Sequence, residues 1–284
     1  MAHQAEKRNR ARAGVERWNT RYHRQVTSAA QLLSDARTKH VRLAELPDAV
    51  RPQSAADAYG CQAALVGSLI EHYGGAITGY KIACTNPIAQ RQLSVTEPFY
   101  GRLVSSFCFD SPGRLDASQF FMRVVEAEFG FRMARDLEPV SGPRSRDEVA
   151  AAVEAVIPAI EIVDSRFDDW LTIGAYSLIA DNACNAAWVR GPLLRDWRHL
   201  DLAAQPVRVT VNGQVLREGS GAAVLGHPLN ALAWLVNALS SHGITLQAGQ
   251  YITTGVTTEV YMAQAGDRIT ADFGEVGSAA VEFF

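Results

Sequence analysis

The sequence predicts an α+β protein in which helices pack on a large, mostly antiparallel or mixed β-sheet. Two observations favour this class: the N-terminal third has helical periodicity, and the chain from Ile77 onward is a succession of short runs with β character. A third observation excludes alternatives. The sequence has no GxGxxG motif, no P-loop and no regular βαβ alternation, which disfavours a Rossmann or TIM-barrel fold.

Two helices are expected in the N-terminal third. Apolar residues recur near helical spacing in Gln25–Arg37. The segment Arg51–Ser54 interrupts the pattern, and Ser54 is a suitable N-cap for a second helix over Ala55–His72. Gly74 and the glycine after it should end this helix, because Gly readily adopts the left-handed conformation of helix C-termini.

Eight later runs are expected to be strands, because they are rich in β-branched and aromatic residues and because Gly, Pro, Asn or Asp separates many of them. The runs are Thr78–Ala83, Glu126–Ala134, Ala159–Val163, Asn185–Val189, Val207–Asn212, Tyr251–Thr254, Asp267–Phe273 and Ser278–Phe283. Asn212-Gly213 indicates a tight hairpin between Val207–Val211 and Gln214–Arg217.

Two helices should interrupt the strands. Ser145 and Glu148 have the spacing of a capping box, which predicts a helix that Pro158 halts. Pro228 is suited to the first position of a helix over Leu229–Ser241, with His227 just before it.

Composition limits the possible partners. The chain has 284 residues, of which 48% are hydrophobic and 20% charged, so it can bury a substantial core. The net charge of −3 and the pI of about 6.2 give no reason to expect nucleic acid or an anionic membrane as partner. We also expect no membrane span, because no apolar run approaches the length that a span needs. The four cysteines form no CxxC pair, which predicts reduced thiols in a cytoplasmic protein.

The first 24 residues contain seven Lys or Arg residues. No apolar core follows them, so a secretory signal is not expected. We interpret residues 1–25 as a basic arm, a solvated helix or a frayed segment. A nucleic-acid-binding arm is the alternative, disfavoured by the acidic balance of the rest. Residues 26–284 are expected to form one domain whose helical part spans about 26–76.

The most informative residues are acidic. Glu126 and Glu128 lie two apart in a predicted strand, so their carboxylates point to the same face of an otherwise apolar segment. Glu161 is a third acid in an apolar run. Like charges this close are unfavourable unless a cation lies between them, and three carboxylates favour a hard cation such as Mg²⁺ or Mn²⁺. The alternative is an edge strand with a solvated charged face.

Two further sites are candidates. Lys81 could pair with a substrate carboxylate or transfer a proton beside a metal, although it could also be a surface lysine on an edge strand. Asp181 and Asn182 could be an ordinary turn, or a polar pair that hydrogen-bonds the water or the surroundings of the site.

Five segments resemble, in order, the motifs of the 2-keto-4-pentenoate hydratases of the fumarylacetoacetate hydrolase superfamily. They are Gly79–Thr85, Val125–Glu128, Pro158–Arg166 with Asp169-Trp170, Ala180–Ala183, and Gly226–Ala231 with Trp234-Leu235. Each motif is weak alone, but five in the right order and at the right spacings are specific. The resemblance runs from about Ala29 to the C-terminus.

This resemblance implies a mixed sheet rolled into a barrel-like sandwich, with N-terminal helices and homo-oligomeric assembly. It implies Mg²⁺ or Mn²⁺ held by Glu126, Glu128 and Glu161. It also implies substrate contacts from Lys81 and Ser165 and catalytic roles for Lys81, Asp181 and Asn182. The implied reaction adds water to a 2-hydroxy-2,4-dienoate and gives a 4-hydroxy-2-oxo acid.

The chain departs from the family pattern at two positions. Cys184 stands where some hydratases have Ser, and Glu259 lies in a late loop that is usually uncharged. Because of these two departures, the resemblance does not fix the identity of the substrate. A 2-oxo-acid decarboxylase or an acylpyruvate hydrolase of the same superfamily is the alternative enzyme. A binding protein that keeps only the fold is disfavoured by the intact acidic residues and Lys81.

Overall fold

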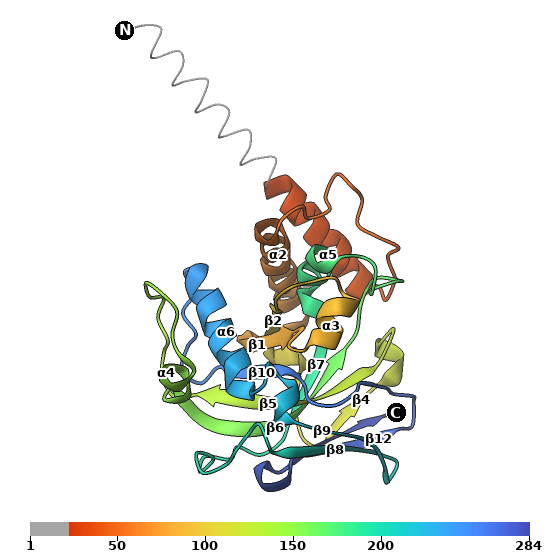
Figure 1. Ribbon diagram of the computed structural model, residues 1–284. Helices are drawn as coiled ribbons and strands as arrows, with labels where there is room; N and C mark the ends of the chain where they lie inside the picture. The colour runs from red at the N-terminus through yellow and green to blue at the C-terminus, as the bar shows by residue number, and fades with distance from the viewer. Residues whose placement is uncertain (1–22) are drawn as a thin grey trace, which may run out of the picture.

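A computed structural model describes residues 23–284 (Figure 1). The predicted basic arm therefore lies outside the described residues, apart from its last three, which are helical. The first helix covers residues 23–38, and α2 covers Ala55–Tyr73. Ser54 caps α2 by accepting a hydrogen bond from the backbone of Asp57, and Gly74 ends it with a φ of 76°. Both N-terminal helices are confirmed.

The larger sheet has eight strands. These are β1 Ile77–Ala83, β2 Phe99–Val104, β3 Cys108–Asp110, β5 Val124–Met133, β6 Val153–Val163, β7 Asn185–Arg190, β10 Tyr251–Val256 and β11 Tyr261–Met262. They are ordered β2-β1-β10-β5-β6-β7-β3, with β11 also paired to β5. The β1–β10 and β3–β7 pairs are parallel and the others antiparallel, so the sheet is mixed.

The smaller sheet has five strands, ordered β4-β13-β12-β8-β9. Their bounds are β4 Gly113–Leu115, β8 Pro206–Val211, β9 Gln214–Ser220, β12 Arg268–Asp272 and β13 Ser278–Phe283. The β8–β9 hairpin turns at Asn212 and Gly213, with φ values of 51° and 83°. Positive φ at both positions is what a two-residue hairpin needs, so the Asn-Gly prediction is confirmed.

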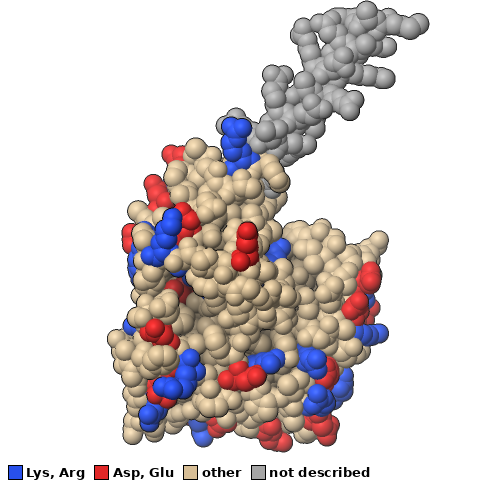
Figure 2. Space-filling view, turned by 180° about the vertical axis from the view of Figure 1, so that it is seen from behind, with Lys and Arg blue, Asp and Glu red and all other residues tan. Residues whose placement is uncertain are grey.

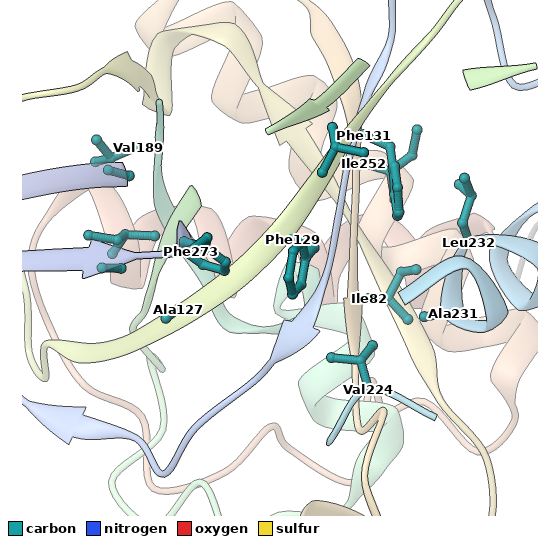
Figure 3. Close-up of a cluster of buried hydrophobic side chains, with 14 of the residues drawn as sticks. Ile82, Ala127, Phe129, Phe131, Val189, Val224, Ala231, Leu232, Ile252 and Phe273 are labelled. Atoms are coloured by element: carbon teal, nitrogen blue, oxygen red, sulfur yellow. The ribbon is translucent and has the colours of Figure 1, made fainter. Parts of the chain in front are cut away.

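A hydrophobic core joins the two sheets. Alternate residues of β5, including Ala127 and Phe129, point toward the smaller sheet, where Phe129 packs edge-on against Phe273 with 5.0 Å between ring centroids (Figure 3). Helix α6 (Pro228–Ser241) adds Leu232 and neighbouring side chains to this core. Because strand residues alternate between faces, the other face of β5 carries the residues between these apolar ones. The α+β class is thereby confirmed.

The remaining helices are short. They are α3 Pro87–Gln92, α4 Arg146–Ala150 and α5 Ala175–Ala180, with 3₁₀ turns at Ser105–Phe107, Ala117–Gln119, Asn182–Cys184, Gly221–Ala223 and Gly274–Val276. His227 caps α6 by accepting from the backbone of Leu229, and Pro228 follows at the first helical turn, as predicted.

The prediction that Pro158 halts the α4 helix is wrong. The capping box between Ser145 and Glu148 is present, but the helix ends at Ala150 and β6 runs through Pro158. The Pro158 carbonyl accepts a hydrogen bond from Gly191 just beyond the end of β7. The Pro158 nitrogen, which has no hydrogen to donate, faces the same side of β6. The hydrogen-bond ladder with β7 has already ended at that point, so the proline removes no hydrogen bond between strands.

The expectation that no apolar run reaches the length of a membrane span also needs correction. Within residues 23–284, Gly221–Ser241 is long and apolar enough by composition, and half of it is buried. Its helical part, α6, contributes seven buried residues to the protein core. Figure 2 shows acidic and basic side chains mixed along the left, lower and right parts of the face in view, around a largely tan centre. All four cysteines are unbridged, as expected.

Candidate metal centre

The three predicted carboxylates meet on one face of the larger sheet. Glu126 on β5 lies directly opposite Glu161 on β6, and Glu128 follows two residues later on the same face of β5. One oxygen from each carboxylate lies within 4.8 Å of the other two. The register of one strand pair therefore brings together acids that are 33 to 35 positions apart in the sequence.

The solvated edge-strand alternative is wrong. Strand β5 lies between β10 and β6 in the interior of the sheet. The side chains of Glu128 and Glu161 are fully buried, and only Glu126 is partly exposed. Burying ionised carboxylates without compensating charge is strongly unfavourable, so the cluster needs cations around it. Glu126 marks the side from which solvent reaches it.

Lys81 supplies one of these cations. It lies on β1, between β2 and β10, and is 2% exposed, which excludes a surface lysine. Its Nζ is 3.2 Å from Glu161 Oε1 and donates to the Ala183 carbonyl at 2.9 Å. One ammonium cannot balance three carboxylates, so the cluster has a net negative charge when all groups are ionised.

Two neutral side chains orient the carboxylates. Asn185 Nδ2 donates to Glu161 Oε1 at 2.9 Å, and the Thr253 hydroxyl donates to Glu128 Oε2. The other oxygens, Glu128 Oε1 and Glu161 Oε2, are buried and have no hydrogen-bond partner among the described residues. In both Glu128 and Glu161, one carboxylate oxygen is thus held by a hydrogen bond and the other is left without a partner. This is the arrangement that a divalent cation with oxygen ligands requires.

Burial dominates the titration of the cluster. It raises the pKa of Glu161 to about 7, although the nearby Lys81 ammonium opposes the shift. Burial also raises the pKa of Glu126 and, further, that of Glu128, where the negative charges of Glu161 and Glu126 add to the effect. For Lys81, burial alone would lower the pKa, but the three carboxylates outweigh it and raise the pKa.

Without metal, stability should therefore fall as the pH rises. A carboxyl whose pKa is higher in the folded than in the unfolded state stabilises the fold only while it is protonated. For Glu161 this contribution is complete below the ordinary pKa of 4.5 and is lost as the pH rises past the folded-state pKa of about 7. We expect the melting temperature of the metal-free protein to drop by on the order of 5 °C between these pH values, and Mg²⁺ to reverse the drop. Thermal denaturation with EDTA or Mg²⁺ checks this. A drop of the same size with both additives would place its cause outside the cluster.

Asp181 and Asn182 lie near the cluster but are already engaged. Asp181 Oδ1 accepts from Arg166 Nε at 2.7 Å, and both side chains are buried. Asn182 bonds through both side-chain groups to the backbone of Arg102 on β2. Through these contacts Asp181 and Asn182 hold the chain in place. A direct catalytic role for either residue stays a prediction.

The backbone around them is unusual. Asn182, Ala183 and Cys184 all have positive φ, between 52° and 59°, which costs energy for residues with a Cβ. The result is that the Ala183 carbonyl points at Lys81 Nζ. The strained turn therefore positions Lys81, and its cost is offset by the bonds that Asp181 and Asn182 make.

The other singled-out residues have structural partners. Ser165 is buried, and its hydroxyl accepts from the Phe167 backbone. Cys184 is buried beside Ser165, and burial raises its pKa to about 12. Glu259 is exposed and lies 3.6 Å from Arg217 Nε, so its carboxylate faces solvent. A substrate contact from Ser165 remains a prediction.

Sequence reasoning missed Thr253 and Asn185 as parts of the site. The sequence places Thr253 in a predicted strand but does not show that its side chain is fully buried, where its hydroxyl needs a partner. Asn185 begins a predicted strand, and its burial, at 1% exposed, likewise becomes visible only in the structure.

Known proteins resemble the chain over most of its length. Residues 90–283 match the family described as fumarylacetoacetate (FAA) hydrolase C-terminal. A 2-keto-4-pentenoate hydratase of Paraburkholderia xenovorans is 35% identical over 259 residues, 91% of this chain and 95% of the relative. A 2-hydroxyhexa-2,4-dienoate hydratase of Comamonas testosteroni is 34% identical over 261 residues, with 91% and 97% covered.

A solved structure shows the same fold. The 4-oxalocrotonate decarboxylase of Pseudomonas putida G7, complexed with magnesium and adipate, superposes with a TM-score of 0.84 at 31% identity, covering 92% of this chain and 98% of the other. The sequence matches, the shared fold and the acidic cluster agree. The chain belongs to the fumarylacetoacetate hydrolase family and within it to the group of the 2-keto-4-pentenoate hydratases.

Proposed function

We propose that this protein is a divalent-metal-dependent hydratase that adds water to a 2-hydroxy-2,4-dienoate and gives a 4-hydroxy-2-oxo acid. The observation that carries the proposal is the buried cluster of Glu126, Glu128 and Glu161 with Lys81 beside it. The relatives named as hydratases, at 34 to 35% identity over 91% of the chain, support this reaction above the other reactions of the family.

The proposed metal ligands are Glu126, Glu128 and Glu161, because their carboxylate oxygens lie within 4.8 Å of one another and two of them have a buried oxygen without a hydrogen-bond partner. Mg²⁺ or Mn²⁺ held there would supply a Lewis acid for the carboxylate and 2-oxygen of the substrate. Among these three carboxylates only that of Glu126 is partly exposed, so the substrate would approach from its side.

Lys81 is proposed to bind the substrate and move a proton. Its Nζ is fixed by the Ala183 carbonyl and by Glu161, which leaves its remaining N–H donor for a substrate carboxylate or for the dienol oxygen. The raised pKa keeps it protonated at neutral pH, so it acts first as a cation and donor. Asp181 and Asn182 are proposed to maintain this position through the strained turn. Ser165 is proposed as a further substrate contact at the end of β6.

The alternative reactions are decarboxylation of a 2-oxo acid and hydrolysis of an acylpyruvate. The experiment that separates them follows the ultraviolet absorbance of several 2-hydroxydienoates and acylpyruvates in the presence of Mg²⁺, with the product identified. The proposal expects 2-hydroxypenta-2,4-dienoate to yield 4-hydroxy-2-oxopentanoate. Release of CO₂, or cleavage of an acylpyruvate without hydration of any dienoate, would assign the site to the alternative.

We further propose that the protein works as a cytoplasmic homo-oligomer on small 2-oxo or 2-hydroxydienoic acids, without nucleic acid or membrane as partner. The support for assembly is family likeness alone. Light scattering at micromolar concentration is expected to show a species at a multiple of the 30.9 kDa chain mass. A single species at that mass would contradict this prediction.

A further inference from the structure

We propose that Gly101 and Gln62, here called the turn seat, are positioning residues for Lys81. They support the strained turn Asn182–Cys184, whose Ala183 carbonyl accepts from Lys81 Nζ. The turn seat acts through this carbonyl and does not itself touch the substrate. The inference rests on the proposed function in one respect, because it takes Lys81 as the group that meets the substrate.

Gly101 lies directly beneath the strained turn. It is the cross-strand partner of Lys81, on β2 opposite β1. A Cβ added at Gly101 would lie 2.4 Å from the Asn182 carbonyl oxygen and 3.2 Å from the Ala183 Cβ. Because the nearer obstacle is backbone and real Cβ atoms do not approach other atoms within 3.0 Å, the turn would have to move. The absence of a side chain at Gly101 therefore lets the Ala183 carbonyl reach Lys81 Nζ at 2.9 Å.

The free edge of β2 fixes the turn in register. Within residues 23–284, β2 is an edge strand of the larger sheet, so one side of its backbone has no neighbouring strand. The Asn182 side chain takes that place at Arg102. Its Oδ1 accepts from the Arg102 backbone nitrogen at 2.7 Å, and its Nδ2 donates to the Arg102 carbonyl at 2.8 Å. The amide offers one acceptor and one donor group, as a paired strand residue does, and this holds the turn against the adjacent Gly101.

Gln62 supports the turn from α2. Helix α2 lies beside α5 over β1 and β2 (Figure 1). The Gln62 side chain is fully buried, and its Nε2 donates to the carbonyls of Tyr100 at 2.8 Å and Ile179 at 2.9 Å. Its Oε1 accepts from Arg102 Nη1. One amide thus ties the edge strand β2 to the end of α5, the helix that leads directly into the turn Asn182–Cys184.

The position of the turn decides where Lys81 directs its free N–H group. An ammonium has three N–H donors, and the Ala183 carbonyl and Glu161 engage two of them. If the turn moved, Lys81 Nζ would keep the attraction of Glu161 but lose the carbonyl, and the third N–H would point elsewhere. A displacement of about 1 Å at a positioned group can cost on the order of 100-fold in turnover. The proposed metal ligands lie on β5 and β6, so metal binding should persist.

The test is a double-mutant cycle between Gly101→Ala and Lys81→Met. Calorimetry measures the binding of 2-oxopentanoate to Mg²⁺-loaded protein, and steady-state kinetics measure the hydration of 2-hydroxypenta-2,4-dienoate. Gly101→Ala alone should lower the 2-oxopentanoate affinity and kcat by about tenfold or more. In the Lys81→Met background the same substitution should add less than about threefold, because its effect passes through Lys81.

Three results of this cycle would overturn the inference. The first is a Gly101→Ala variant that binds and turns over like the parent. The second is an equal loss with and without Lys81, which is what general damage to the fold produces. The third is loss of Mn²⁺ binding in Gly101→Ala, because the seat would then support the metal centre as a whole.

Gly67→Ala is the matched control for adding a methyl group. Gly67 lies on α2, where an added Cβ would meet nothing within 4 Å outside the backbone of its own helix, so the variant should behave like the parent. Gln62→Met tests the seat from its other side. It keeps the length of the side chain but removes three hydrogen bonds, and it should lower kcat by roughly tenfold with the same dependence on Lys81.

Gln53→Met controls for the loss of a glutamine, because Gln53 is exposed just before α2. Thermal denaturation of every variant shows whether it is folded. If Gly101→Ala does not fold, the cycle of Gln62→Met with Lys81→Met decides by the same criteria.

The two readouts separate this inference from the proposed function. Hydration by the parent, with losses that depend on Lys81, supports both. Hydration by the parent together with parent-like Gly101→Ala and Gln62→Met variants overturns the inference while the hydratase assignment stands. Absence of hydration in the parent overturns the proposed function, and 2-oxopentanoate calorimetry then decides the inference alone. A parent that neither hydrates the dienoate nor binds 2-oxopentanoate overturns both.

Discussion

Glu126→Gln and Glu161→Gln are each expected to lose most turnover while the protein stays folded. Each substitution removes an anionic ligand from a hard cation but keeps the size of the side chain. Metal affinity should fall by about 10- to 100-fold or more, because replacing residues that only hydrogen-bond to metal ligands already lowers affinity on that scale. The metal-free variants should be at least as stable as the parent, because the change relieves repulsion between buried carboxylates.

Glu154→Gln is the matched control for both variants. Glu154 lies on β6 like Glu161, but it pairs with Arg132 and Arg195 away from the cluster. The two site variants and the control are compared by calorimetry with Mn²⁺ and by thermal denaturation of the metal-free proteins. If the two site variants bind Mn²⁺ as tightly as the parent and the control, the ligand assignment is wrong.

Lys81→Met should have a different effect. The substitution removes the ammonium but keeps an unbranched apolar stem, so metal affinity should stay within about tenfold of the parent value or increase, because a cation beside the metal is lost. Turnover should fall by roughly 10²- to 10⁴-fold, the range for losing a group that assists proton transfer or stabilises developing charge.

Lys39→Met controls for the loss of a lysine as such. Lys39 is exposed and pairs with Asp35 one helical turn away. Mn²⁺ calorimetry and steady-state kinetics are measured for both variants. Normal turnover in Lys81→Met would remove Lys81 from the mechanism. Loss of Mn²⁺ binding would assign Lys81 to the integrity of the metal centre and not to the substrate.

Local signals were sufficient for many elements of this fold. The Ser54 cap, the capping box at Ser145, Pro228 at a helix start and the Asn212-Gly213 turn act within a few residues, and each produces the predicted structure. Such features depend on backbone groups that are close in sequence, so their geometry can be read without knowledge of the rest of the chain.

Features that depend on tertiary neighbours were not predictable in the same way. Pro158 reads as a helix stop, yet it fits in β6 because the neighbouring strand β7 ends beside it. The short strands β3, β4 and β11 and the six-residue helices α3 and α5 contain too few residues for a clear period. Their conformation is decided by packing against the rest of the protein.

The candidate site shows the same division. Alternation along β5 places Glu126 and Glu128 on one face from sequence alone. The sequence also singles out Glu161 and Lys81, and the family resemblance assigns all four residues to one site. The register that sets Glu126 opposite Glu161 becomes visible only in the structure. The same holds for Thr253 and Asn185, whose polar groups matter because of the carboxylate that each one meets across the sheet.

The most direct test of the central claim is the metal itself. Protein freed of metal with EDTA is titrated with Mn²⁺ by calorimetry, and hydration of 2-hydroxypenta-2,4-dienoate is assayed before and after Mg²⁺ is added back. The three carboxylates predict one bound ion per subunit, no turnover without metal and full recovery with Mg²⁺. Full turnover in a preparation shown by elemental analysis to contain no divalent metal would contradict the claim.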